Sequence, residues 1–193
     1  MAVSYSFGSI TMTDALHDNY RLLARYNRLF NARLYDACEK LSDEERKRDC
    51  GAFFGSIHGT LNHLIWADKL WLARLAAQRP EFMAVLTPEL LALPPGAVHA
   101  TMLHEDWALL RAEREKLDAA IEAWVDGFTP DFPQSVMRYA NTRGVRREHP
   151  AWIALTHFFN HQTHHRGQVT TLLMQAGVDP GVTDLIAFAT APH

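Results

Sequence analysis

Apolar residues recur at helical spacing in four long stretches of the chain. In the first stretch, residues 11–41, they follow one another at steps of three and four, the pattern of an amphipathic helix packed against other helices. The same pattern predicts helices at residues 51–77, 101–127 and 150–176, with ends placed to within about four residues. Together they predict an all-α four-helix bundle, a fold that builds metal sites from side chains on facing helices. The charged residues of the third stretch are assigned to its solvent face: Arg111, Glu113, Arg114, Glu115 and Lys116.

The segments between these helices carry turn and capping signals. Ser42 begins a Ser-x-x-Glu capping box, which predicts one short helical turn. Residues 79–96 contain four prolines and are interpreted as a connection with one helical turn, and His99 and His104 beyond it as surface or capping residues. Residues 128–149 break the helical pattern and predict an irregular insertion or a short hairpin before the last long helix.

Histidines are concentrated in the last long stretch. Four of the eleven in the chain lie there: His157, His161, His164 and His165. At about 100° per residue, His157, His161 and His165 form one stripe with apolar neighbours, so we expect it to face inward. His161 and His165, one turn apart, can hold one metal ion between them, and His157 is their rival one turn earlier. Gln162 follows His161 where an H-E-x-x-H metalloprotease needs its glutamate, which argues against that class.

A third metal ligand is sought on the second predicted helix. His58 and His63 lie about 140° apart on it, so they cannot both face one site. His63 shares its face with Trp66 and other apolar residues, and is the better partner for the stripe; the alternative is a hydrogen-bonded core histidine. Arg74, a little further along this face, either holds an anionic substrate group or is an exposed helix arginine. Asp68 lies about 140° from His63 and is interpreted as structural.

Length, charge and cysteine usage narrow the class of protein. The 193 residues fit one domain spanning 1–193, and 48% hydrophobic residues allow a sizeable core. A net charge of −3 without a long basic run argues against nucleic acid as the main partner. An apolar run long enough for a membrane span and a signal-peptide pattern are both missing. Cys38 and Cys50 lack metal or disulfide spacing, so we expect reduced thiols and a cytoplasmic protein.

Several segments resemble the DinB/YfiT-like superfamily. They are LNHLIWADKLWLARL at 61–75, HFFNHQTHHRGQVTTLLMQAG at 157–177, GVTDLI at 181–186 and SDEERKRD at 42–49. The resemblance implies an up-down-down-up bundle, often a homodimer, with a divalent metal, zinc or nickel among others. By position it implies His63, His161 and His165 as the ligands and leaves His164 out. Relatives of known function use a low-molecular-weight thiol, such as bacillithiol S-transferases and mycothiol-dependent maleylpyruvate isomerase.

The residues and the resemblance leave three hypotheses for function. In the first, the protein is a metal-dependent enzyme in which the metal activates a thiol or water against a small-molecule substrate, as a thiol S-transferase, an isomerase or a hydrolase. In the second, it is a non-catalytic binding or stress-response module that the metal stabilises, and a protein side chain such as His157 closes the fourth metal position. The third and weakest hypothesis is a DNA-associated protein, because the net charge is negative. The residues name neither the substrate nor a general base, and imidazole suits several metals.

Overall fold

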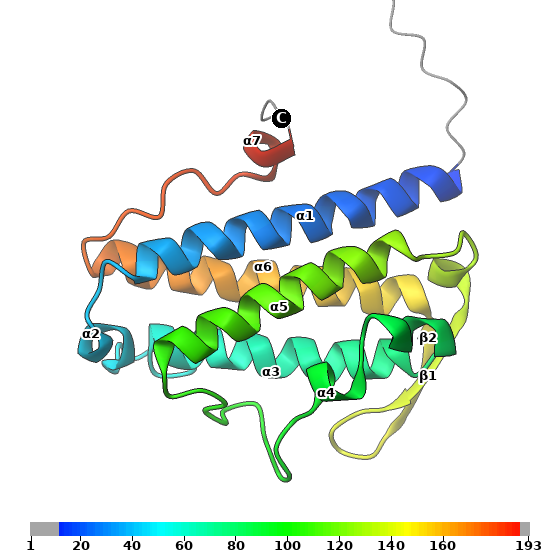
Figure 1. The fold of residues 1–193 in the computed structure, drawn as a ribbon, viewed down its shortest axis with the longest axis horizontal. Helices are drawn as coiled ribbons and strands as arrows, with labels where there is room; N and C mark the ends of the chain where they lie inside the picture. The colour runs from blue at the N-terminus through cyan, green and yellow to red at the C-terminus, as the bar shows by residue number, and fades with distance from the viewer. Residues whose placement is uncertain (1–11, 190–193) are drawn as a thin grey trace, which may run out of the picture.

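Four long helices form a bundle in the computed structural model, which describes residues 12–189 (Figure 1). They are α1 (Met12–Cys38), α3 (Ile57–Ala76), α5 (Trp107–Asp126) and α6 (Ala151–Gln175). In Figure 1, α1 and α6 run in one direction and α3 and α5 run in the other, so the order is up-down-down-up. Helix α1 packs against α5 and α6, and α3 packs against α6 and α5. The predicted all-α bundle is confirmed.

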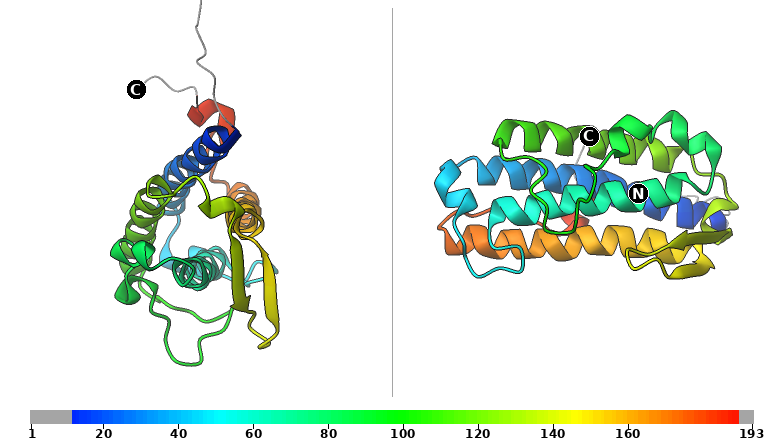
Figure 2. Two further views of the ribbon diagram at one scale, coloured as in Figure 1. Left: turned by 90° about the vertical axis from the view of Figure 1, so that its right-hand side faces the viewer. Right: turned by 90° about the horizontal axis from the view of Figure 1, so that it is seen from below.

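Short elements occupy the connections. They are α2 (Asp43–Lys47), η1 (Pro80–Ala84), α4 (Pro88–Leu91), η2 (Phe132–Gln134) and α7 (Leu185–Ala189). The capping box at Ser42 is present, since its side chain accepts from the Glu45 amide and the Glu45 carboxylate accepts from the Ser42 amide. The predicted hairpin is also present, as the antiparallel pair β1 (Val136–Ala140) and β2 (Arg146–Pro150), which stands beside one end of α6 (Figure 2).

Two of the long helices begin six residues later than predicted. Ser56 caps α3 and Asp106 caps α5, and each side chain accepts a hydrogen bond from the amide three residues further on, at 3.0 and 2.9 Å. Before α3, Gly51 and Gly55 adopt positive φ values of 68° and 74°, which an α-helix does not contain. Residues 51–55 therefore form a tight turn instead of the first turns of the helix.

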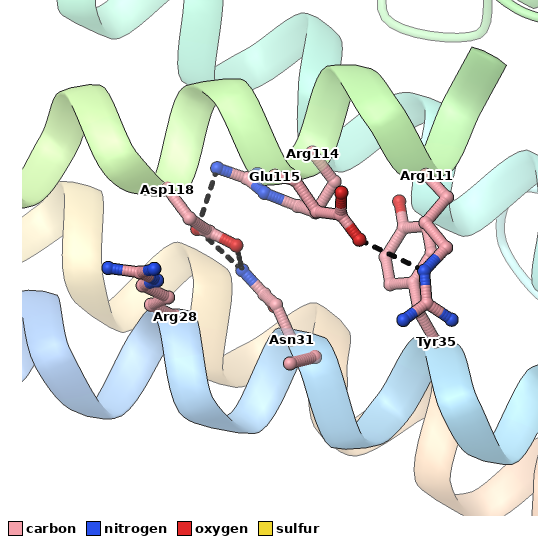
Figure 3. A pocket seen from close by; sticks show the side chains of 8 residues that line it. Arg28, Asn31, Tyr35, Arg111, Arg114, Glu115 and Asp118 are labelled. Atoms are coloured by element: carbon pink, nitrogen blue, oxygen red, sulfur yellow. Dashed lines mark hydrogen bonds and ion pairs between the residues drawn. The ribbon is translucent and has the colours of Figure 1, made fainter. Parts of the chain in front are cut away.

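Ionised side chains lie inside the bundle. Arg114, assigned to the solvent face from the sequence, is in fact only 3% exposed and donates a hydrogen bond to Asp68. It also pairs with Asp118 at 2.9 Å, beside a cavity of about 270 Å³ between α1 and α5 (Figure 3). Arg166 on α6 is buried as well and donates to the Asn27 side chain. The charges are tolerated because each meets an opposite charge or an amide, which offsets the cost of desolvation.

Gln162 connects this buried network to the helix that carries the histidines. Its amide nitrogen donates to Asp68 at 3.0 Å, and both side chains are 1% exposed. The bond joins α6 to α3 next to His161, so it helps to set how the two helices lie against each other. Asp68 is therefore structural, as expected.

No helix in the part of the chain that the structure describes is long and apolar enough to cross a membrane.

Candidate metal centre

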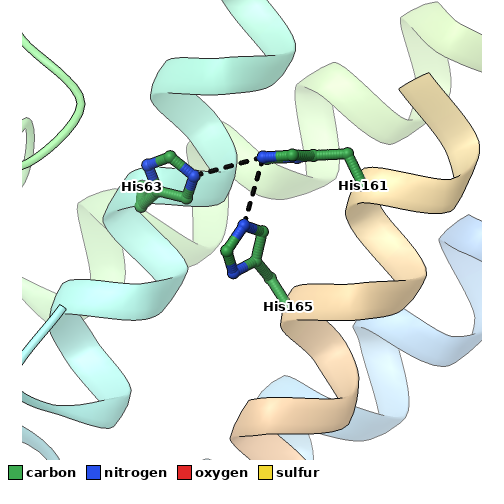
Figure 4. A group of neighbouring side chains, drawn as sticks. All are labelled: His63, His161 and His165. Carbon is green, nitrogen blue, oxygen red and sulfur yellow. Dashed lines mark hydrogen bonds between the residues drawn. The ribbon is translucent and has the colours of Figure 1, made fainter. Parts of the chain in front are cut away.

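Three histidine rings converge where α3 faces α6. His63 projects from α3, and His161 and His165 project from successive turns of α6 (Figure 4). The Nε2 atom of His161 lies 3.3 Å from Nε2 of His63 and 3.1 Å from Nε2 of His165. One ring nitrogen from each residue lies within 4.8 Å of the other two. The structure thus brings together the three side chains that the helical faces selected.

Hydrogen bonds at the outer ring nitrogens orient two of these histidines. Nδ1 of His63 donates to the backbone carbonyl of His99, and Nδ1 of His165 donates to Oε1 of Gln168, both at 2.8 Å. The amide nitrogen of Gln168 lies 3.3 Å from His164 Nε2, so the same side chain contacts both histidines. Because a carbonyl oxygen can only accept, His63 and His165 each carry their proton on Nδ1, and the lone pair of each Nε2 faces the centre of the cluster. Metal-binding histidines typically have such partners.

Burial keeps the three imidazoles neutral. Desolvation lowers the pKa of His63 to about 4, and electrostatic repulsion from His165 adds to this effect. The hydrogen bond from His63 to the His99 carbonyl acts in the opposite direction and only partly offsets it. Desolvation and the charges of the other histidines lower the pKa of His161 to about 3, and burial lowers the pKa of His165 too. At neutral pH each ring therefore has the unprotonated nitrogen that a metal requires.

The geometry of the three nitrogens fits a metal ion. Two ring nitrogens 3.1–3.3 Å apart need a proton or a cation between them, because two facing lone pairs would repel each other. Two ligands at 2.0–2.1 Å in a tetrahedral site are about 3.3–3.4 Å apart, so a cation fits here with little rearrangement. Among the described residues no carboxylate or thiol joins the group. Three imidazoles suit zinc, nickel, iron or copper better than magnesium or calcium, and leave the fourth position open.

Other histidines lie outside this group. The His157 ring is exposed and 5.7 Å from the ring of His161, so the rival ligand is not brought to the centre. His164 is exposed on the next face of α6. His58 is fully buried and donates from Nε2 to the His104 carbonyl at 2.8 Å, turned away from His63 as predicted.

Two contributors to the site escaped the sequence reasoning. Phe54, in the turn before α3, stacks on His63 with ring centroids 3.8 Å apart and also lies 5.5 Å from the ring of His165. His99 was assigned to the surface or a cap, and its exposed side chain agrees, but its carbonyl fixes the His63 tautomer. Gly51 and Gly55, on either side of Phe54, were the only sequence signal for the tight turn. Nothing in the sequence indicates that the backbone carbonyl of His99 would bind His63.

The fold and this cluster define an all-α bundle with a histidine triad that could hold a metal ion. Residues 12–192 match the model of the DinB family, and the chain belongs to that family. Comparison with curated proteins and with solved structures finds no significant match.

Proposed function

We propose that the protein binds a divalent transition metal, zinc or nickel, through Nε2 of His63, His161 and His165. One observation carries the proposal: three neutral imidazoles direct their Nε2 atoms at one point, with His161 Nε2 3.3 Å from that of His63 and 3.1 Å from that of His165, while hydrogen bonds hold the other two rings from behind. His161 has a single ring proton, so as a hydrogen-bonding core residue it cannot give each of its two close contacts a separate donor, whereas one metal ion would satisfy all three nitrogens.

We further propose that this centre is the active site of an enzyme acting on a small molecule, as a thiol S-transferase, an isomerase or a hydrolase. When bound at three protein nitrogens, a divalent metal lowers the pKa of a thiol or water at its open position and so supplies a nucleophile near neutral pH. The histidines contribute by staying neutral, and Phe54 contributes by covering one side of His63 and keeping water from that side. Asp68 is engaged with Arg114 and Gln162 and is not free to act as a base.

The alternative is a non-catalytic module that uses the metal to join α3 to α6. Such a site would need a fourth protein ligand to close it. In the described part of the chain, the histidine group has three members, and His157 remains outside it. This observation favours the enzyme.

Elemental analysis of the purified protein is the first test, followed by thiol-transfer and hydrolysis assays with the identified metal restored. We expect about one metal ion per chain, and activity that depends on it. A His161→Ala variant should lose both, while His164→Ala, a matched change at an exposed neighbour, should keep both. Full metal content without any turnover across thiols and electrophiles would favour the non-catalytic module.

Two further parts of the proposal concern assembly and location. We propose a homodimer, supported by large exposed apolar side chains such as Leu109 and Trp152, 59% and 45% exposed. We also propose a cytoplasmic protein, supported by Cys38 and Cys50, which are both free thiols. The net charge of −3 supports a small molecule as the partner in preference to nucleic acid.

A further inference from the structure

A line of aromatic and basic side chains leads from the histidine centre to the β-hairpin. The His157 ring lies 5.7 Å from that of His161 and 4.8 Å from that of Trp71. The Trp71 ring in turn lies 5.5 Å from that of Tyr139 on β1. His157 is exposed, and Trp71 and Tyr139 are half-buried, so each of the three side chains presents part of its surface to solvent.

Arg74 is the cation at the far end of this line. Its guanidinium carbon lies 4.9 Å from the centre of the Trp71 ring and 5.1 Å from that of Tyr139. These contacts place the guanidinium without neutralising it. The sequence left open whether Arg74 was simply exposed; it is half-buried, which removes part of its hydration.

Arg74 also differs from comparable arginines in having no counter-ion. Arg79 and Arg111 are half-buried too, and both pair with carboxylates, Arg79 with Asp131 and Arg111 with Asp36 and others. Within residues 12–189, no carboxylate lies within 4.0 Å of the Arg74 guanidinium. A planar, partly desolvated guanidinium that is held in place and unpaired is suited to a carboxylate ligand.

We infer that Arg74 binds the carboxylate of an elongated thiol substrate whose sulfur lies at the histidine centre. This inference rests on the proposed function and adds a substrate class to it, a small thiol acid. Trp71 and Tyr139 act as positioning residues that hold the guanidinium toward the line of side chains. The step is binding alone, with the carboxylate accepting from the guanidinium and the thiol proton passing to solvent.

The test uses full-length protein loaded with cobalt(II), whose visible spectrum gains a charge-transfer band when a thiolate binds. The probes are straight-chain ω-mercapto acids of increasing length, each compared with the ω-mercapto alcohol of equal length. We expect the acids to bind about tenfold more tightly than the alcohols once the chain is long enough to reach Arg74, as a hydrogen bond to a charged group implies. Short acids should show no such preference.

Variants identify the group responsible. Arg74→Gln should reduce the acid-to-alcohol preference to about one and leave the affinity for the alcohols unchanged, which also shows an intact fold and metal centre. If Arg74→Gln fails to fold, Arg74→Met retains the stem over the rings and should give the same result. Arg146→Gln removes an exposed arginine from β2 of the hairpin that carries Tyr139, with an equal change of charge, and should keep the preference.

The outcomes separate the inference from the proposed function. If acids and alcohols bind equally at every length, if the preference survives loss of Arg74, or if Arg146→Gln abolishes it equally, the Arg74 assignment is wrong while thiol binding at the metal stands. If the wild-type protein takes up no cobalt or gives no thiolate band, both are wrong.

Discussion

Truncating His161 is the sharpest perturbation of the proposed centre. Its Nε2 atom lies between the other two, 3.3 Å from His63 and 3.1 Å from His165. Both close nitrogen pairs of the cluster include His161. His161→Ala therefore leaves only two ligands, His63 and His165, and removes both short nitrogen–nitrogen contacts. Two imidazoles on different helices hold a metal far more weakly than three, and we expect the variant to lose the ion during dialysis.

The size of the effect follows from linkage. A ligand that binds only the folded state stabilises it by about 2.7 kcal/mol when its free concentration is 100 times its Kd. For a chain of about 150–250 residues, 1 kcal/mol shifts Tm by about 2–4 °C, so added metal should raise the Tm of the wild-type protein by about 5–11 °C. His161→Ala should show a shift near zero. Without metal the two proteins should differ by about 1 kcal/mol, as is usual for one substitution.

Calorimetry with and without added zinc or nickel, after treatment with a chelator, measures both Tm shifts, and elemental analysis measures the bound metal. His164→Ala is the control because His164 is exposed on the same helix, three residues away, and outside the cluster. The assignment fails if His161→Ala keeps its metal and its full Tm shift. It also fails if His164→Ala loses both.

Three other predictions concern stability and assembly. Because burial lowers the pKa of His63 to about 4 from about 6.5 in the unfolded chain, the metal-free protein should be most stable above pH 6.5, and protonation of this residue alone should cost up to about 3 kcal/mol as the pH falls toward 4. Urea unfolding at pH 7.5 and at pH 5 measures this, and equal stability at the two values would contradict it. Arg114→Ala should cost about 3–5 kcal/mol because it leaves Asp68 and Asp118 buried without their cation, whereas Arg111→Ala, at a more exposed ion pair, should cost about 1 kcal/mol or less. Chemical denaturation compares them, and similar costs would argue against a network that needs its charge. Light scattering at micromolar concentration should give twice the chain mass of 21.9 kDa, and a single-chain mass would exclude the proposed homodimer.

The local pattern of the chain already determined the main elements and the grouping of the histidines. A helix repeats every 3.6 residues whatever surrounds it, so the apolar spacing was enough to predict α1, α3, α5 and α6. The same period placed His157, His161 and His165 on one stripe and selected His63 over His58; the structure brings His63, His161 and His165 together and leaves His157 outside. These inferences held because each concerns residues within one helix.

Only the tertiary structure decided how these helices meet and what surrounds the cluster. Arg114 reads as a solvent residue among charged neighbours, and it is buried because Asp68 and Asp118 approach it within the bundle. The His99 carbonyl, the Phe54 ring and the unpaired Arg74 likewise acquire their roles from contacts outside their own segments, with His63, with His63 and His165, and with Tyr139 respectively. Helix periodicity specifies which way a side chain points from its own axis, but pairing, burial and backbone acceptors depend on what the rest of the chain places opposite it.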